Sequence, residues 1–221
     1  MDRWREKNGE VFSIPKDNPT VPGCTISKSV FAGEENNLIY FSLAEDTSIS
    51  AETYQNPKLL ILNSGSMTVF TPEGAEQKMQ AGDVTVMPAG TPVGMRTEEG
   101  AVYTELSLGK EQHMNKVLEA GKVMKLADLV PYQEGRIVNM DLINEDHLKF
   151  VIMAFDEGTG LTEHAAPGEA LIFALEGDGV IGYEGESHPI HAGENFKFAK
   201  NGRHSVQAKG RFKMALLLTL D

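Results

Sequence analysis

From Phe31 onward, the chain alternates short apolar runs with turns that are rich in Gly and Pro. The runs have the length of strands and carry many β-branched and aromatic residues, which favour strands over helices. Regular spacing of such runs is typical of an antiparallel sandwich or barrel, so the pattern predicts an all-β fold. The runs are "NNLIYFSLAED", "KLLILNSGSMTVF", "DVTVMPAG" and "AVYTELSLG" in the first half, and "RIVNMDLI", "LKFVIMAFDEG", "ALIFALEGDGVIGY", "ENFKFAK" and "RFKMALLLTL" in the second.

Two segments depart from this pattern. Residues 1–30 are polar and hold three prolines, which predicts an extended N-terminal arm. Residues 110–124 are rich in helix formers and predict a short helical connector. The apolar residues of this connector share one helical face, and a glycine follows as a helix end: Met114, Val117, Leu118 and Gly121.

The two halves of the chain repeat one another. The segment "LLILNSGSMTVFTPEGAEQKMQAGDVTVMPAG" matches "LIFALEGDGVIGYEGESHPIHAGENFKFAKNG" when Gly65 is aligned with Gly177 and Gly82 with Gly193. Each copy has a strand, a bend that contains glycine, a return strand, a second hairpin and then Ala-Gly followed by an acidic residue. An internal repeat of about 110 residues is the most informative feature of the sequence.

Composition narrows the class of protein. The formal net charge of −12 argues against nucleic acid and against an anionic membrane surface, since both require clustered Lys and Arg. Cys24 is the only cysteine, which excludes an internal disulfide and a thiolate metal cluster. The charged N-terminus lacks the apolar core of a secretory signal, and no apolar run approaches the roughly 20 residues that span a bilayer. We therefore expect a cytoplasmic protein with no membrane partner.

The repeat resembles the cupin superfamily, and the whole chain resembles a two-domain cupin, or bicupin. The resemblance rests on "HAAPGEALIFALEGDG" and "AGENFKFAKNGRH" in the second half, and on "LNSGSMTVF" and "AGDVTVMPAGTP" in the first. The C-terminal half is especially similar to small single-domain bacterial cupins. The resemblance implies two jelly-roll barrels of the double-stranded β-helix type, at residues 31–109 and 125–221, and a homodimer.

Many metal-binding cupins place His-x-His-x-x-x-Glu on one strand and a last His after the next turn. Carried over to this sequence, His164 fills the first position and His204 the last, whereas Ala166 and Ala170 occupy the other two. Glu169 stands one residue away from the Glu position, so on a regular strand its side chain points out of the barrel unless a bulge turns it back. The resemblance therefore implies at most one weakly held divalent ion, Zn, Mn, Ni or Fe, on His164 and His204.

In the first half, the corresponding positions are Glu52, Tyr54, Lys58 and Val93, and no histidine precedes His113. We therefore predict that the N-terminal barrel holds no metal. An inward Lys58 is costly unless Glu52 pairs with it. The alternative is a strand shifted by one residue, which leaves both charges in water.

The alanines near His164 leave volume that something must fill. In one interpretation, the side chains of Phe150, Phe196 and Phe198 fill it. In the other, a ligand does, which gives an apolar pocket with His164 and His204 as its polar groups. Two further histidines, His188 and His191, are three residues apart on a predicted strand, so they face opposite ways and do not form a ligand pair.

Three functional interpretations remain. The leading one is a cupin that binds a small polar metabolite, a sugar or an organic acid, in the C-terminal barrel. Its predicted ligand-binding residues are His164, His204, Glu169, Ala166, Ala170, Phe196 and Phe198. The second is a metal-dependent isomerase, lyase or dioxygenase, for which the sequence identifies no catalytic residue. The third is a non-catalytic structural or assembly protein with both barrels filled.

Overall fold

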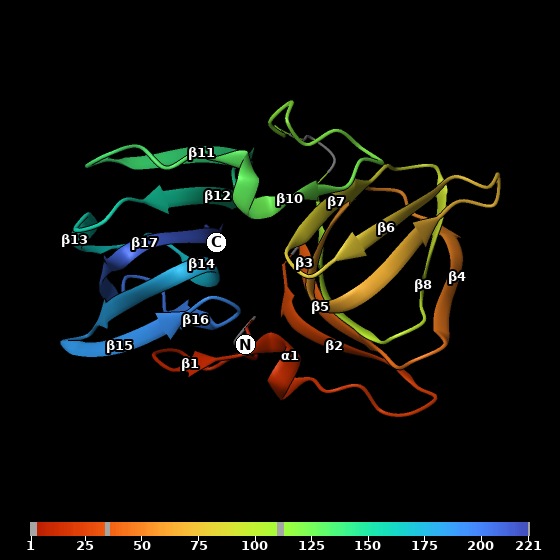
Figure 1. The fold of residues 1–221 in the computed structure, drawn as a ribbon, viewed down its shortest axis with the longest axis horizontal. Helices are drawn as coiled ribbons and strands as arrows, with labels where there is room; N and C mark the ends of the chain where they lie inside the picture. Colours follow the sequence, from red (N-terminus) through yellow and green to blue (C-terminus); the bar gives the residue numbers. More distant parts are fainter. Residues whose placement is uncertain (1–3, 34–35, 110–112, 221) are drawn as a thin grey trace. The chain divides into compact units, whose positions relative to one another are not determined.

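The computed structural model describes residues 4–33, 36–109 and 113–220. Within these residues the fold is all-β: 17 strands accompany one four-residue α-helix, α1 (Ile14–Asp17), and one short 3-10 helix, η1 (Leu126–Leu129) (Figure 1). None of the helices in this part of the chain is long and apolar enough to cross a membrane. The all-β fold predicted from the apolar runs is confirmed.

The chain divides into two compact units. We call the first the N-terminal unit; it consists of Met1–Arg5, Ile14–Gln112 and Leu118–Leu126. The second is the C-terminal unit, which consists of Glu6–Ser13, His113–Val117 and Ala127–Asp221. These limits differ from the boundaries expected at residues 30, 109 and 124, because two short segments pair with strands far away in the sequence.

The described residues of the N-terminal unit form an antiparallel sheet of nine strands in the order β10-β7-β5-β9-β3-β2, with β4, β6 and β8 attached through β5 and β8. Their bounds are β2 (Thr25–Ala32), β3 (Asn37–Leu43), β4 (Thr47–Thr53), β5 (Lys58–Phe70), β6 (Glu76–Gln80), β7 (Asp83–Met87), β8 (Pro92–Thr97), β9 (Ala101–Ser107) and β10 (Met124–Lys125).

In the C-terminal unit, the described residues form an eight-stranded antiparallel sheet in the order β1-β16-β14-β17-β12-β11. Strand β13 pairs with β17, and β15 pairs with β14. The bounds are β1 (Val11–Phe12), β11 (Ile137–Asn144), β12 (Leu148–Phe155), β13 (Gly160–Ala165), β14 (Glu169–Tyr183), β15 (Glu186–His191), β16 (Asn195–Phe198) and β17 (Arg203–Thr219).

One long strand in each unit bends at the glycine that the repeat aligns. Strand β5 pairs with β7 and β9 before Gly65 and with β6 and β8 after it. Strand β14 likewise pairs with β16 before Gly177 and with β15 after it. Gly65 and Gly177 have φ of 77° and 71°, and a Cβ at either position would collide with a backbone carbonyl oxygen. Only glycine accepts both constraints.

The helical connector predicted at residues 110–124 is wrong for its described part, residues 113–124, which contains no helix. Residues 110–112 lie outside the described residues. Backbone groups in this segment form hydrogen bonds with residues of distant strands, and not with residues four positions earlier as in an α-helix. Gly121 N–H donates to the Val86 carbonyl oxygen, and the Gln77 side chain accepts from Val123 N–H. Strand β10 then pairs with β7. Helix propensity is weak compared with such tertiary pairing.

The arm predicted at residues 1–30 is only partly extended chain. Val11 and Phe12 form β1 on the edge of β16, and β2 already begins at Thr25. Gly9 N–H also donates to the carbonyl oxygen of Lys197. An exposed sheet edge carries unpaired backbone groups, which explains why a polar, proline-containing segment is drawn into strand pairing.

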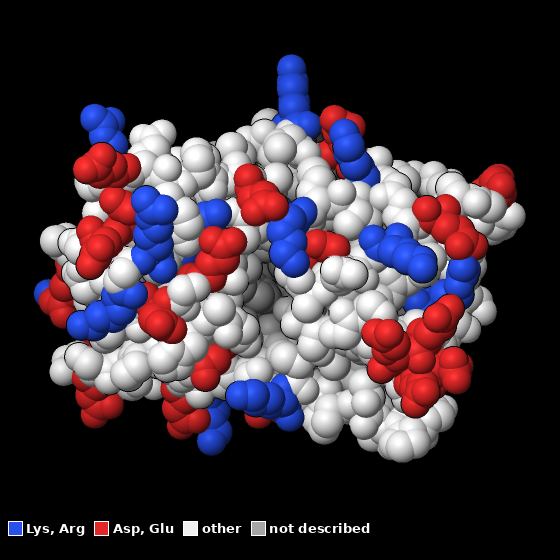
Figure 2. Space-filling model, in the orientation of Figure 1, with Lys and Arg blue, Asp and Glu red and all other residues white. Residues whose placement is uncertain are grey.

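Charged side chains of both signs are interspersed over the face seen in Figure 2. Such mixing is typical of a solvated surface.

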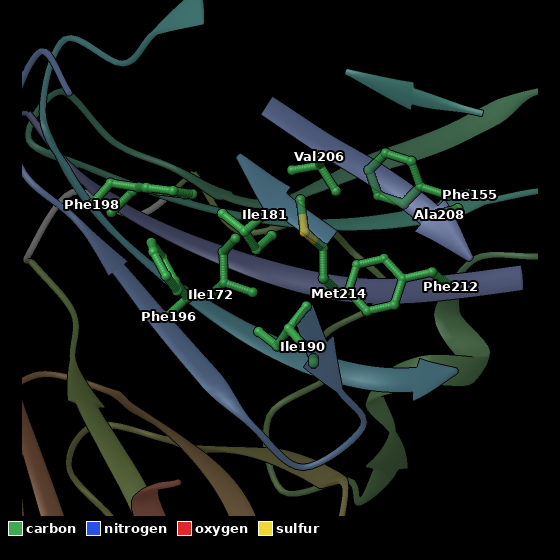
Figure 3. Packing of buried hydrophobic residues seen from close by; sticks show 12 residues of the cluster. Phe155, Ile172, Ile181, Ile190, Phe196, Phe198, Val206, Ala208, Phe212 and Met214 are labelled. Atoms are coloured by element: carbon green, nitrogen blue, oxygen red, sulfur yellow. The ribbon is translucent and has the colours of Figure 1, made fainter. Parts of the chain in front are cut away.

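Each unit has its own apolar core. The C-terminal core is rich in phenylalanine (Figure 3) and comprises Phe155, Ala170, Ile172, Ala174, Ile181, Ile190, Phe196, Phe198, Val206, Ala208, Phe212 and Met214. The N-terminal core is rich in methionine and comprises Leu43, Leu60, Leu62, Met67, Met79, Met87, Val93, Met95, Ala101 and Tyr103.

Candidate functional site

The structure brings His164 and His204 together. His164 lies on β13 and His204 at the start of β17, and the two residues are direct partners across the antiparallel pair. The centroids of their rings are 4.3 Å apart. Two histidines that are 40 residues apart in the sequence therefore share one place on the C-terminal unit, as the motif positions predict.

The two imidazoles are held in the same tautomer. Nδ1 of His164 lies 2.8 Å from the Thr162 carbonyl oxygen, and Nδ1 of His204 lies 2.9 Å from that of Gly202. A carbonyl oxygen only accepts, so each Nδ1 carries the proton and each neutral ring keeps its lone pair on Nε2. Metal-ligating histidines are commonly oriented by this kind of bond to a backbone carbonyl.

The two rings differ in burial. His204 is 4% exposed and stacks on Phe198, with ring centroids 4.1 Å apart, whereas His164 is exposed. Burial lowers the pKa of His204, the Gly202 carbonyl partly opposes this, and His164 nearby lowers it further. The pair thus has one face toward the core and one toward solvent. His204 favours the neutral form, whose Nε2 lone pair can bind a metal ion or accept a hydrogen bond from a ligand.

The predicted positions between the histidines contribute no ligand. Ala166 is buried, and its carbonyl oxygen accepts from Asn201 N–H. Ala170 is fully buried opposite Phe198 in the β14–β16 pair. Among the described residues, no group of three or more His, Cys, Asp or Glu side chains could hold a metal ion. The donor set thus fits a divalent cation only as two imidazoles whose remaining ligands come from elsewhere.

Glu169 does not join the histidines. Its carboxylate lies 2.5 Å from the ammonium of Lys197, which also donates to the Asn8 side chain. Lys197 alternates with Phe196 and Phe198 on β16, so it points to the opposite face from the apolar core. The register from Glu169 to Ala174 is regular, so no bulge in β14 turns Glu169 inward.

Phenylalanines fill the interior beside the alanines. Phe196 and Phe198 are fully buried in the C-terminal core, as Figure 3 shows, and Phe155 and Phe212 join them there. Phe150 does not: it packs edge-on against Phe173, with ring centroids 6.4 Å apart. The expectation that Phe150 fills the interior is therefore wrong, because β12 and β14 bury apolar side chains on both faces.

The histidines outside the pair have other environments. His191 is exposed on β15, with Nδ1 2.7 Å from the Asp178 carboxylate, which raises its pKa. His188, three residues earlier, lies instead beside Phe196. The prediction that these two histidines face opposite ways is confirmed.

In the N-terminal unit, two of the corresponding positions, Tyr54 and Lys58, form a polar cluster with two residues of β9, Tyr103 and Glu105. We call these four residues the Lys58 cluster. Lys58 pairs with Glu105 at 2.5 Å, not with Glu52 as considered from the sequence. Its ammonium also lies 3.7 Å from the centroid of the Tyr54 ring. Lys58 precedes Leu60 and Leu62 on the same face of β5, so it does face the core.

Burial controls the protonation of this cluster. Glu105 is 1% exposed, and burial raises its pKa even though Lys58 opposes the shift. Burial, together with the nearby carboxylates of Glu105 and Glu52, raises the pKa of Tyr54 to about 12. The pKa of Tyr103 is raised for the same reasons, burial first and then Glu105. Both phenols stay protonated at neutral pH and can donate hydrogen bonds.

Sequence reasoning identified Lys58 and Tyr54 but missed Glu105 and Tyr103. A signal was present, because Glu105 is a lone acid inside the apolar run "AVYTELSL" and Tyr103 precedes it by two residues. That Glu105 would pair with Lys58 could not be inferred from this signal. The pairing depends on β5 and β9 being neighbours, which brings together two residues that are 47 positions apart.

Comparison with known proteins agrees with this geometry. Residues 151–220, from β12 to the end of β17, match the family model described as Cupin domain. This segment contains both histidines of the pair. No curated protein matches the chain in sequence.

Solved structures with the same fold cover nearly all of the chain. The cupin 2 conserved barrel domain protein from Leptotrichia buccalis is 24% identical with a TM-score of 0.87, over 99% of this chain and 100% of that one. Protein Ylba from E. coli is 13% identical with a TM-score of 0.63, and the match covers 99% of this chain and 94% of Ylba. Salicylate 1,2-dioxygenase from Pseudoaminobacter salicylatoxidans, in adducts with gentisate, is 11% identical with a TM-score of 0.65. This match covers 95% of this chain and 80% of the dioxygenase chain. At these identities the likeness shows the fold alone, an all-β cupin-like barrel fold.

Proposed function

We propose that the protein is a two-domain cupin that binds a small polar metabolite, a sugar or an organic acid, at the His164–His204 pair of the C-terminal unit. In this proposal each unit is one jelly-roll barrel. The matching bends at Gly65 and Gly177 support two barrels of the same kind. The homodimer and the cytoplasmic location remain predictions from the sequence.

The observation that carries the proposal is the matched orientation of the two imidazoles. Both Nδ1 atoms bond to backbone carbonyl oxygens, and neither Nε2 has a hydrogen-bond partner among the described residues. Two fixed, adjacent nitrogen acceptors suit a divalent cation or the hydroxyl groups of a ligand. In this proposal the ligand lies at the edge of the apolar core, where His164 is exposed, because packed phenylalanines fill the interior.

A divalent ion at this pair would be weakly held, because only two protein ligands are present. His164 and His204 would hold it, and it would supply a positive charge that attracts the oxygen of a sugar or carboxylate. The other groups act without it: Phe198 fixes the plane of His204 by stacking, and the carbonyl oxygens of Thr162 and Gly202 fix both tautomers.

The filled interior favours a second candidate, a non-catalytic structural or assembly protein. Phe196 and Phe198 are fully buried with Ala170 between β14 and β16, so the positions that the other ligands would occupy are packed. In that case the histidine pair serves packing alone, and removing His164 changes no binding property.

Calorimetric titration of the intact protein with Zn, Mn, Ni and Fe(II) separates the two candidates. We expect binding that weakens at least about tenfold in His164→Ala and in His204→Ala, since each variant loses half of the protein ligands. His191→Ala is the matched control, because His191 is an exposed histidine with a carboxylate partner. Absence of binding, or binding that is unchanged in both variants, would reject the histidine site and leave the structural candidate.

A further inference from the structure

The Lys58 cluster contains a buried hydroxyl group that the fold does not satisfy. Tyr103 is 0% exposed, and its hydroxyl has no hydrogen-bond partner in the described part of the chain. A buried tyrosine hydroxyl usually finds a partner, and leaving it unpaired is unfavourable. The ring itself is well packed, stacked on Phe41 with centroids 4.9 Å apart. Packing therefore explains the aromatic ring but not the hydroxyl.

A second polar atom beside it is also unpaired. The ion pair with Lys58 uses one carboxylate oxygen of Glu105, and the other has no hydrogen-bond partner among the described residues. Tyr103 and Glu105 are two residues apart on β9, so their side chains point to the same face. The cluster thus offers a hydrogen-bond donor and an acceptor side by side, both turned toward the core.

The cluster is connected to solvent. Glu52 is exposed, and Tyr54, whose hydroxyl lies 3.4 Å from the Glu52 carboxylate, is half-buried. Lys58 comes next with a side chain that is 16% exposed, and Glu105 lies innermost at 2%. Burial therefore increases step by step from Glu52 to Tyr103, so the cluster extends from the surface to the core.

The surrounding core can adapt to a guest. Four of its buried residues are methionines, whose flexible side chains repack more easily than branched or aromatic ones: Met67, Met79, Met87 and Met95. Two residues of this core, Met87 and Val93, are the strand partners of Lys58 and Glu52. The core next to the Lys58 cluster therefore contains side chains that can repack around a guest.

The charges restrict the class of ligand. Lys58 repels a cation, whereas Glu52 and Glu105 repel an anion, so the site favours a neutral molecule. An unpaired phenol and an unpaired carboxylate oxygen require groups that both accept and donate, as hydroxyl groups do. The rings of Tyr54 and Tyr103 add apolar faces, which suit the carbon skeleton of such a molecule.

We propose that the N-terminal unit binds a small neutral polyhydroxylated ligand, of the sugar or polyol class, through Tyr103, Glu105, Lys58 and Tyr54, without a metal. The site lies in the other unit from the histidine pair and uses none of its residues, so it goes beyond the function proposed above.

The test is a calorimetric titration of the intact protein, in EDTA, with D-glucose, D-xylose and glycerol. Gluconate and glucosamine serve as anionic and cationic counterparts of glucose. We expect at least one neutral probe to bind and both charged ones to bind more weakly. Tyr103→Phe should lower the affinity at least about tenfold through the lost hydrogen bond. Tyr40→Phe, which changes a buried tyrosine on the opposite face of β3 from Phe41, should leave it unchanged.

Thermal unfolding of Tyr103→Phe without ligand gives a second, independent measurement. Removing a hydroxyl that the fold leaves unpaired should raise the Tm or leave it unchanged. A fall in Tm would mean that the hydroxyl is satisfied in the folded protein and would overturn the proposal. Failure of every neutral probe to bind, tighter binding of gluconate than of glucose, or equal affinity in Tyr103→Phe would overturn it as well. None of these outcomes bears on metal binding by His164 and His204.

Discussion

The two units fill equivalent positions with opposite chemistry. Where the C-terminal unit has His164, Ala166 and Ala170, the N-terminal unit has Glu52, Tyr54 and Lys58. In the C-terminal unit, phenylalanines pack against the alanines and the only polar pair of the motif sits at the edge of the core. In the N-terminal unit, the Lys58–Glu105 ion pair lies beside a core that is rich in methionine.

The contrast teaches that the glycines, and not the functional positions, are common to both copies. Gly65 and Gly177 both adopt positive φ at the bend of a long strand, and so do Gly82 and Gly193 at the later turn. Backbone geometry limits these positions strictly, whereas an interior accepts any set of side chains that fills its volume and pairs its polar groups.

The largest effect is expected at the two bends. Gly65→Ala and Gly177→Ala should each destabilise the protein by at least about 4 kcal/mol, because the new Cβ meets a backbone oxygen at a positive φ. Gly193→Ala is the matched control: it has φ of 87° but open space around the Cβ, so it should cost about 1 kcal/mol. Urea unfolding of the three variants measures this. A small effect at only one bend would break the equivalence of the two units.

The next effect concerns the buried ion pair. Lys58→Met should cost about 3 kcal/mol at pH 8, since it leaves the Glu105 carboxylate buried without a cation. The pKa of Glu105 is already raised by burial, so protonation relieves this cost and the variant should recover stability as the pH falls through that pKa.

Urea unfolding at pH 8 and pH 5 checks this sign. The double variant Lys58→Met, Glu105→Leu removes both charges and should show little pH dependence from this site. A cost for Lys58→Met that is identical at both pH values would show that Glu105 stays ionised and that the pair is not buried as described.

A smaller effect separates the histidines. Burial lowers the pKa of His204, so the unfolded chain binds a proton near pH 6.5 before the folded protein does. Because of His204, the free energy of unfolding should therefore decrease as the pH falls below about 6.5. The decrease should be at most about 1.4 kcal/mol per pH unit. Denaturant unfolding in EDTA should show this decline in the native protein and less of it in His204→Gln.

His191 provides the control of opposite sign. The hydrogen bond that His191 donates to the Asp178 carboxylate raises the pKa of His191, so its contribution to stability is present at low pH and is lost as the pH rises through that pKa. His191→Gln should thus remove stability at pH 5 and change little at pH 8. The same pH trend in both histidine variants would contradict the assigned environments.

Strand content and the repeat could be predicted because each depends on local spacing. The histidine pair could be predicted because the resemblance to cupins puts His164 and His204 at two motif positions. Alternating apolar residues define strands, and the aligned glycines mark the bends that Gly65 and Gly177 make. The structure of the connector could not be predicted, because it depends on distant residues. Gly121 N–H donates to a residue 35 positions away and Val123 N–H to one 46 positions away. The partner of Lys58 depended in the same way on the register of β5 with β9, which the sequence alone does not determine.

We propose that the two units differ in what they bind: a cation or metabolite at the histidine pair, and no metal in the N-terminal unit. A crystal structure of the protein soaked with Co(II), measured with anomalous scattering, locates the metal directly. We predict one partly occupied peak next to Nε2 of His164 and His204, completed by solvent, and no peak at Glu52, Tyr54 and Lys58. A peak within the Lys58 cluster, or the absence of any peak at the histidine pair, would contradict the account.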